Sequence, residues 1–229
     1  MMRNLTNYIN EALITENFHT AIGKSNISSL VDKHGDELIK MIYDAYKYIG
    51  GAIGFETKED IVRESDLIKT FKKDNKIVAV VCYATKRHPN KDAVILNNDR
   101  TKNFGRKIVC FASLPEYTDY LKKILIEDFK DQRRNVWCEA SAKAATLCLK
   151  CGAKPIPNKV SKEILSDKIF TDTKYDGFFY TREIGGKPHT KVLLGNHLFY
   201  EHNTDKSLSE DELKYFKQLA IKYSKEDIY

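Results

Sequence analysis

The sequence predicts an α/β fold of the mixed α+β kind, with one central sheet flanked by helices. A strand, a helix and a second strand follow one another between residues 107 and 140, and such a unit pairs its strands in parallel. Hairpins at 67–85 and 177–194 precede and follow this unit and add antiparallel strands. The composition, 42% hydrophobic and 31% charged among 229 residues, suits one globular domain with an appended end.

The N-terminal part is predicted to be helical, with a linker. Residues 1–16 form a short amphipathic segment with apolar residues at helical spacing. Residues 17–33 are polar and irregular and include Gly23, so we expect a linker there. A helix is expected over 36–48, ended by two glycines, and a weaker helix over 58–66.

The central elements alternate between strands and helices. The hairpin at 67–85 turns at Asp74-Asn75. The buried strand KIVCFA, residues 107–112, leads through Pro115 into a helix over 116–130. Another strand is expected over 136–140, and then a helix over 142–151 that Gly152 ends as its C-cap.

The C-terminal part is predicted to contain a hairpin and a helix. Two glycines at 185–186 form the turn of the second hairpin. An amphipathic helix over 207–223 has Ser209 and Glu212 at the spacing of a capping box. We therefore divide the chain into four parts: an N-terminal segment 1–16, a linker 17–33, one domain 34–198 and a helical extension 199–229.

Charge, the length of apolar runs and cysteine content narrow the classes of protein that this sequence fits. The net charge of +6 is modest, and lysines alternate with acidic residues, which is typical of a solvated surface and gives nucleic-acid binding only weak support. No apolar run is long enough for a membrane span, and no secretory leader is expected. Five cysteines without framework spacing indicate reduced thiols in a cytoplasmic protein. Cys148 and Cys151 have a metal-like spacing but no second pair, so we expect no metal site.

The stretch VWCEASAKAATLCLKCGAKPIP, residues 136–157, is a strand followed by a helix of small residues that stops at a glycine. Together with the order of elements over 36–194, it resembles the GCN5-related N-acetyltransferase (GNAT) superfamily, in a divergent phage-type branch. The resemblance implies a parallel pair of strands that splay apart. The pantetheine arm of acetyl-CoA pairs with such strand edges and packs beside the small-residue helix.

The resemblance also implies the cofactor site. Acetyl-CoA would lie along the fourth strand and its loop, and against the small face of the following helix. The corresponding residues are Cys110, Phe111, Ala112, Ser113, Leu114, Ser141, Ala144, Ala145 and Cys148. Small residues on that helix would equally allow close packing of the helix on the sheet.

The loop after the fourth strand departs from the superfamily pattern. Members carry a glycine-rich turn whose N–H groups bind the pyrophosphate at a helix N-terminus. Here the sequence CFASLPEYTDYLKK has no glycine, Pro115 offers no N–H, and Glu116 and Asp119 repel anions. Either this loop binds CoA in an unusual way, or the chain has changed or lost its donor.

The implied reaction is direct attack of an amine acceptor on the thioester in a ternary complex, which needs a base and an acid. Glu139, just before the splay, is the candidate base; it would otherwise be an outward carboxylate paired with Lys or Arg. Ser141 would donate to the leaving sulfur or cap the next helix. Tyr180, expected to face His189 across the second hairpin, is the candidate acid or a packing residue.

A run of tyrosines corresponds to the part of the superfamily that shapes the acceptor pocket. Such a run is also typical of a core. It comprises Tyr43, Tyr46 and Tyr48, followed by Gly50 and Gly51.

The N-terminal sequence MRNLTNYINEA resembles the capsid-targeting peptides of large tailed phages. Residues 8–12 match the aromatic-Ile-x-Glu-Ala pattern, which the prohead protease cuts after the Glu, and a second site ends at Glu16. The resemblance implies a phage-encoded protein of the host cytoplasm that can be packaged in the virion, with the prohead and its protease as partners. An ordinary N-terminal helix would show the same spacing.

The sequence thus favours an N-acetyltransferase that moves an acetyl group from acetyl-CoA to an amine. Two alternatives stay open: a catalytically silent binding or virion-packaged protein with the same fold, and a nucleic-acid base modifier on the same scaffold. The modest net charge speaks against the last of these.

Overall fold

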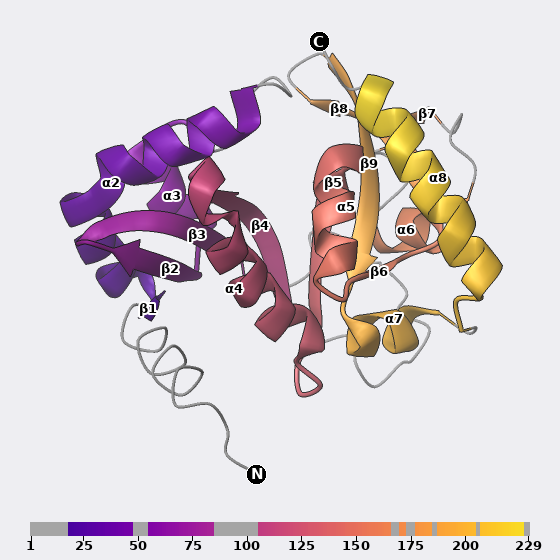
Figure 1. The fold of residues 1–229 in the computed structure, drawn as a ribbon, viewed down its shortest axis with the longest axis horizontal. Helices are drawn as coiled ribbons and strands as arrows, with labels where there is room; N and C mark the ends of the chain where they lie inside the picture. The colour runs from indigo at the N-terminus through magenta and orange to yellow at the C-terminus, as the bar shows by residue number, and fades with distance from the viewer. Residues whose placement is uncertain are drawn as a thin grey trace.

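The computed structural model describes residues 18–47, 55–84, 105–165, 170–172, 177–184, 187–204 and 207–226 (Figure 1). The predicted N-terminal targeting peptide lies outside these residues, as do Tyr48, Gly50 and Gly51. No helix in the described ranges is both long and apolar enough to cross a membrane.

The described strands form one nine-stranded sheet in the order β1-β2-β3-β4-β5-β9-β8-β7, with β6 paired to β9. Every described pairing is antiparallel except that of β4 with β5. This arrangement confirms the predicted mixed sheet with a parallel pair in its middle. The strands are β1 Phe18–Ile22, β2 Leu67–Lys73, β3 Lys76–Ala84, β4 Arg106–Ser113, β5 Val136–Ser141, β6 Lys154–Pro155, β7 Phe170–Asp172, β8 Phe179–Ile184 and β9 Lys187–Gly195.

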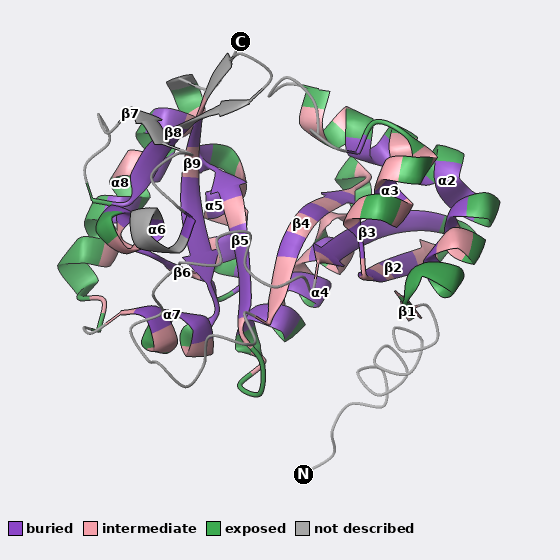
Figure 2. Cartoon of the chain, turned by 180° about the vertical axis from the view of Figure 1, so that it is seen from behind, coloured by how far each residue is buried: buried purple, intermediate pink, exposed green. Residues whose placement is uncertain are grey.

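Helices cover both faces of this sheet (Figures 1 and 2). On one face, α4, α5 and α8 contribute to a single apolar core that spans the sheet from β2 to β8. On the other face the core is divided: one cluster lies between α2, α3 and strands β2–β4, and another surrounds Trp137 of β5. The helices are α2 Lys24–Tyr46, α3 Lys58–Glu64, α4 Thr118–Lys130, α5 Ala142–Lys150, α6 Asn158–Leu165, α7 His197–Asn203 and α8 Glu210–Glu226, with a 3-10 turn at Pro115–Tyr117 before α4.

The predicted linker over 17–33 was wrong. β1 and the first part of α2 occupy these residues, and α2 begins at Lys24 rather than at residue 36. The apolar residues of this region are four or seven positions apart and form one buried stripe that the intervening polar residues concealed. That stripe is Ile27, Val31, Leu38 and Ile42.

Three local predictions are confirmed. Asp74 and Asn75 both have positive φ, 50° and 62°, as a two-residue hairpin turn requires. Gly152, at φ 99°, ends α5, and the Ala153 N–H donates to the Cys148 carbonyl at 3.0 Å, as in a Schellman motif. The capping box at the start of α8 is also formed, with both Ser209–Glu212 hydrogen bonds present.

The expected register of the second hairpin was wrong. Ile184 lies opposite Lys187, and each further step moves both strands by one residue. Tyr180 therefore lies opposite Lys191, while His189 lies opposite Arg182.

The C-terminal helix α8 is part of the main core rather than an appendage to it. Phe216 stacks on Phe179 of β8 with 5.2 Å between ring centroids, and Tyr223 contacts the same ring edge-on. The start of α4 also differs slightly from the prediction, because the chain makes a 3-10 turn over Pro115–Tyr117 before the α-helix begins.

Candidate active site

The parallel strands β4 and β5 pair at three described positions and then diverge. The pairs are Arg106 with Val136, Lys107 with Trp137, and Ile108 with Cys138. Beyond Ile108, β4 continues to residue 113 beside β3, and β5 continues to residue 141 beside β9. The two facing edges therefore open away from each other, which is visible between the halves of the sheet in Figure 1.

Glu139 is the first residue of β5 beyond the paired stretch. Its carboxylate lies 2.9 Å from Lys107 Nζ, and its other oxygen accepts a hydrogen bond from the Tyr180 hydroxyl at 3.0 Å. The Glu139 side chain is only 8% exposed. The ammonium and the hydroxyl thus contact this carboxylate on its two oxygens. From the sequence, Glu139 is either a base or the partner of a Lys or Arg. The structure pairs it with Lys107.

The other two candidate catalytic residues are held by internal contacts. Tyr180 is completely buried in the cluster around Trp137, and its hydroxyl reaches Glu139. Ser141 is the N-cap of α5, where its side-chain oxygen accepts the Ala144 N–H at 3.3 Å. Tyr180 thus contacts Glu139 through its hydroxyl, and Ser141 caps α5.

Tyr46, at the end of α2, reaches the edge of β4 beside the divergence. Its hydroxyl oxygen accepts the backbone N–H of Phe111 at 3.2 Å. Burial raises the pKa of Tyr46 well above its ordinary value, and the adjacent Cys110 thiol adds to this effect. The hydroxyl consequently stays protonated. The neighbouring tyrosine Tyr43 is 63% exposed instead.

The small residues of α5 are used mainly for packing. Ala142, Ala145 and Cys148 are buried in the continuous core, and Ala144 is half-buried against it. A hydrogen bond with Cys138, together with burial, raises the pKa of Cys148 well above its usual range. The thiol is therefore unreactive, and no metal-ligand cluster occurs among the described side chains.

On β4, Cys110 and Ala112 are buried under α2, and Phe111 and Ser113 are half-buried. Beyond them, two backbone N–H groups of the loop donate to carbonyls of the protein itself. The Leu114 N–H donates to the Val78 carbonyl at 3.0 Å, and the Tyr117 N–H donates to the Leu114 carbonyl at 2.9 Å. This loop therefore has fewer N–H groups for an anion than a glycine-rich turn would have.

Lysines balance the acidic start of α4. The hydrogen bond from Lys122 to Asp119, 2.7 Å long, holds the pKa of Asp119 below its usual value. Lys73 lies over the Tyr117 ring, with Nζ 5.2 Å from the ring centroid. The repulsion of anions that the sequence suggested here is thereby reduced.

Two contacts of this site were not predicted from the sequence. One is the ion pair of Lys107 with Glu139, and the other is the hydrogen bond between Tyr46 and β4. The alternation of β4 places Lys107 on the less buried face of the strand, but its partner depends on the parallel register with β5. Tyr46 contacts a residue 65 positions further along the chain, and no local pattern indicates such a pair.

The chain matches no known family model and no curated protein sequence. Among solved structures, it is similar to a protein provisionally named phosphinothricin N-acetyltransferase, at 12% identity and a TM-score of 0.43, over 79% of this chain and 98% of that one. A GNAT-family acetyltransferase from Streptococcus agalactiae 2603 is 9% identical, with a TM-score of 0.39, over 78% of this chain and 94% of that one. One from Bacillus anthracis is 10% identical, with a TM-score of 0.35, over 68% and 82%. At these identities and scores, the similarity assigns neither a family nor an activity to the chain.

Proposed function

We propose that the protein is a GNAT-type acyltransferase that moves an acetyl group from acetyl-CoA to an amine acceptor, by direct attack in a ternary complex. The observation that carries the proposal is the parallel β4–β5 pair, which is paired at three positions and open beyond them. A buried, ion-paired carboxylate, that of Glu139, lies where the opening begins.

The opening suits the pantetheine arm of the cofactor. The Phe111 N–H already donates to an oxygen there, that of the Tyr46 hydroxyl, so this position accommodates a hydrogen-bond acceptor. A pantetheine carbonyl would take the place of the hydroxyl and pair with β4 as a strand would. The phosphates would lie toward the start of α4, near Lys73 and Lys122, because the loop itself offers few N–H groups.

Glu139 would act as the base. Acetyl-CoA supplies an activated acyl group, and the acceptor must lose its ammonium proton before its nitrogen attacks. The ionised Glu139 carboxylate would accept this proton, directly or through one water molecule. Lys107 and Tyr180 hold the carboxylate in place from two sides. A role for Tyr180 or Ser141 as acid toward the leaving thiolate stays a prediction.

Two measurements test the proposal. Titration calorimetry with acetyl-CoA is expected to show saturable binding with a dissociation constant below about 1 mM. Release of free thiol in the presence of a panel of primary amines is expected to depend on the amine. Failure to bind acetyl-CoA would overturn the cofactor assignment, whereas binding without amine-dependent thiol release would overturn the transferase assignment and leave a binding protein.

The phage origin and packaging in a virion rest on the N-terminal sequence. The test is mass spectrometry of purified particles, in which cleavage after Glu11 or Glu16 would give a chain that begins at Ala12 or Asn17.

A further inference from the structure

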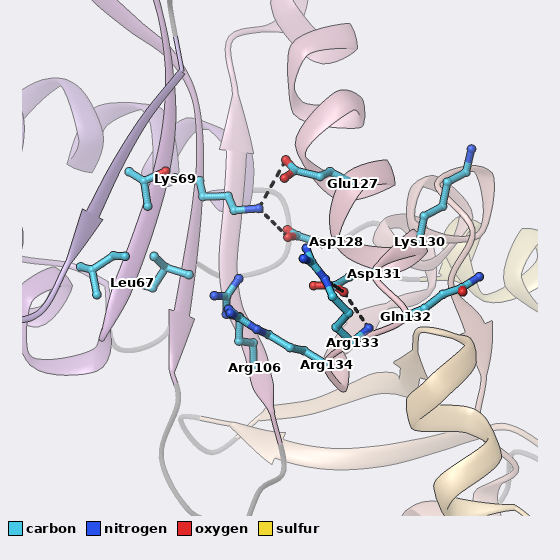
Figure 3. A pocket seen from close by; sticks show the side chains of 12 residues that line it. Leu67, Lys69, Arg106, Glu127, Asp128, Lys130, Asp131, Gln132, Arg133 and Arg134 are labelled. Atoms are coloured by element: carbon cyan, nitrogen blue, oxygen red, sulfur yellow. Dashed lines mark hydrogen bonds and ion pairs between the residues drawn. The ribbon is translucent and has the colours of Figure 1, made fainter. Parts of the chain in front are cut away.

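A second pocket, of about 450 Å³, lies at the other end of α4 from the proposed cofactor site. Strands β1 and β2 form one side of it, and the last turn of α4 with the α4–β5 loop forms the other (Figure 3). The helix α4 has 13 residues, which at 1.5 Å per residue separates its two ends by about 20 Å. The pocket is therefore separate from the start of α4, where the phosphates of acetyl-CoA are proposed to lie.

The three carboxylates of this pocket are balanced in number by three cations of its wall, Lys69, Lys130 and Arg133. Lys69 Nζ lies 2.7 Å from Asp128 and 3.5 Å from Glu127. Asp128 also accepts a hydrogen bond from the buried Tyr83 hydroxyl. Arg133 Nε lies 3.6 Å from Asp131.

Two further guanidinium groups line the same pocket, those of Arg106 and Arg134. Arg106 is the first residue of β4 and is half-buried, and Arg134 lies exposed in the α4–β5 loop. Within the described parts of the chain, no carboxylate forms an ion pair with either of them. Figure 3 shows both side chains extending into the pocket below Lys69. The pocket thus has unneutralised positive charge on side chains that bind oxyanions in a bidentate manner.

We propose that this pocket binds a small molecule that carries a phosphate monoester, with Arg106 and Arg134 as the phosphate ligands. Two unpaired guanidinium charges match a phosphate dianion in charge. The pocket volume falls in the range of small-molecule sites and exceeds what a phosphate alone would fill. Ile22 of β1, 63% exposed, and Leu67 of β2 give the pocket an apolar wall for the rest of the ligand.

The probe for this site is adenosine 5′-monophosphate, with adenosine and inorganic phosphate as companions. Titration calorimetry on the full chain is expected to show binding of the monophosphate and weaker binding of inorganic phosphate. Adenosine is expected to bind at least about tenfold more weakly than the monophosphate, since it lacks the charged group.

Neighbouring arginines supply a matched control. Arg134→Gln and Arg106→Gln are each expected to weaken monophosphate binding by about tenfold or more, because each removes charge-assisted hydrogen bonds. Arg133→Gln, which alters an arginine already paired with Asp131, is expected to change the affinity less than about threefold. Unchanged thermal unfolding of Arg134→Gln, an exposed position, shows that any loss is local.

Three outcomes would overturn the proposal: no saturable monophosphate binding at about 1 mM, equal losses in Arg133→Gln and Arg134→Gln, or binding of duplex DNA alone with a steep salt dependence. These outcomes are separate from the proposed transferase activity, because Arg134 lies at the opposite end of α4. Loss of acetyl-CoA binding in Arg134→Gln would likewise contradict a separate site.

Discussion

Lys107 and Glu139 form an ion pair across the last paired residues of β4 and β5, with 2.9 Å between Nζ and Oε2. Lys107 also lies over the Trp137 ring, with Nζ 5.0 Å from the ring centroid. This ion pair links the two strands at the point where their edges begin to diverge. The two contacts of Glu139 hold its carboxylate in one orientation, which the proposed role as base requires.

Lys107→Met is expected to lower the free energy of unfolding by about 2 kcal/mol, because it leaves the buried Glu139 carboxylate without its cation. Lys122→Met is the matched control, since it breaks a pair whose carboxylate, on Asp119, is 84% exposed; its effect should stay below about 0.5 kcal/mol. Urea unfolding of both variants at neutral pH makes the comparison. Equal losses would mean that burial does not strengthen the Lys107–Glu139 pair.

Glu139→Gln is expected to lower the rate of acetyl transfer by about 100-fold or more, since the amide cannot accept the ammonium proton. The affinity for acetyl-CoA is expected to change little, because Glu139 acts on the acceptor. The rate of thiol release measures transfer, and titration calorimetry measures the affinity for acetyl-CoA. Glu64→Gln on α3, remote from the opening, serves as control. Full activity in Glu139→Gln would remove Glu139 as the base.

Tyr46→Phe is expected to lower the free energy of unfolding of the unliganded protein by about 1 kcal/mol, since the Phe111 N–H loses its acceptor. The same change should tighten acetyl-CoA binding by about two- to tenfold, because a competing oxygen is removed. Unfolding with and without acetyl-CoA measures both quantities. Tyr43→Phe alters an exposed tyrosine three residues earlier and should change neither the free energy of unfolding nor the affinity for acetyl-CoA. Weaker binding in Tyr46→Phe would show that the hydroxyl contacts the ligand instead of giving way to it.

Ser141→Ala is expected to lower the free energy of unfolding by about 1 kcal/mol, because α5 loses its N-cap. Ser141→Asp keeps a capping oxygen and should restore most of that stability. Since the structure places Ser141 in the cap, the rate of acetyl transfer at saturating substrate should be similar in the two variants. The assay is run at low temperature, where Ser141→Ala is fully folded. A loss of transfer in Ser141→Ala under these conditions would instead support a role of Ser141 as a donor to the leaving sulfur.

His19 of β1 gives a prediction of pH dependence. Desolvation lowers the pKa of His19, and electrostatic interactions with Lys72 and His34 lower it further. Because the folded-state pKa lies below the unfolded value of about 6.5, the folded protein binds this proton less readily than the unfolded chain. The contribution of His19 to stability is therefore complete above about pH 6.5 and is lost as the pH falls through the lowered value.

His19→Gln should accordingly lose less stability than the unsubstituted protein between neutral and mildly acidic pH. Chemical unfolding at several pH values in that range measures the slope. His197→Gln, which alters an exposed histidine paired with Glu201, is the control. A slope unchanged by His19→Gln but reduced by His197→Gln would contradict the assignment.

Elements with a local signal were predictable from the sequence. The hairpin at Asp74-Asn75 and the end of α5 at Gly152 each depend on residues whose backbone preferences are strong and local. The start of α2 was not predictable in the same way. Its buried residues Ile27 and Val31 are isolated among polar residues, and only packing against the sheet reveals that they form one stripe.

The candidate site was predictable only in part, for a related reason. Glu139 was identified from its place on a strand before a small-residue helix. Its partners Lys107 and Tyr180 come from strands whose parallel and antiparallel registers are set by tertiary contacts, and one wrong register paired Tyr180 with His189. The arginine pocket likewise joins β4 to the α4–β5 loop, and no spacing in the sequence indicates that Arg106 and Arg134 share a cavity.

The apolar core differs between the two faces of the sheet. The apolar core under α4, α5 and α8 is continuous across the β4–β5 boundary, whereas the core on the opposite face is split into two clusters there. We therefore expect bending of the sheet at this boundary to be resisted mainly by the continuous core, which packs against the three paired positions of β4 and β5. Such bending would change the separation of the two halves on the face that carries Trp137 and Glu139 more than on the face that α5 covers.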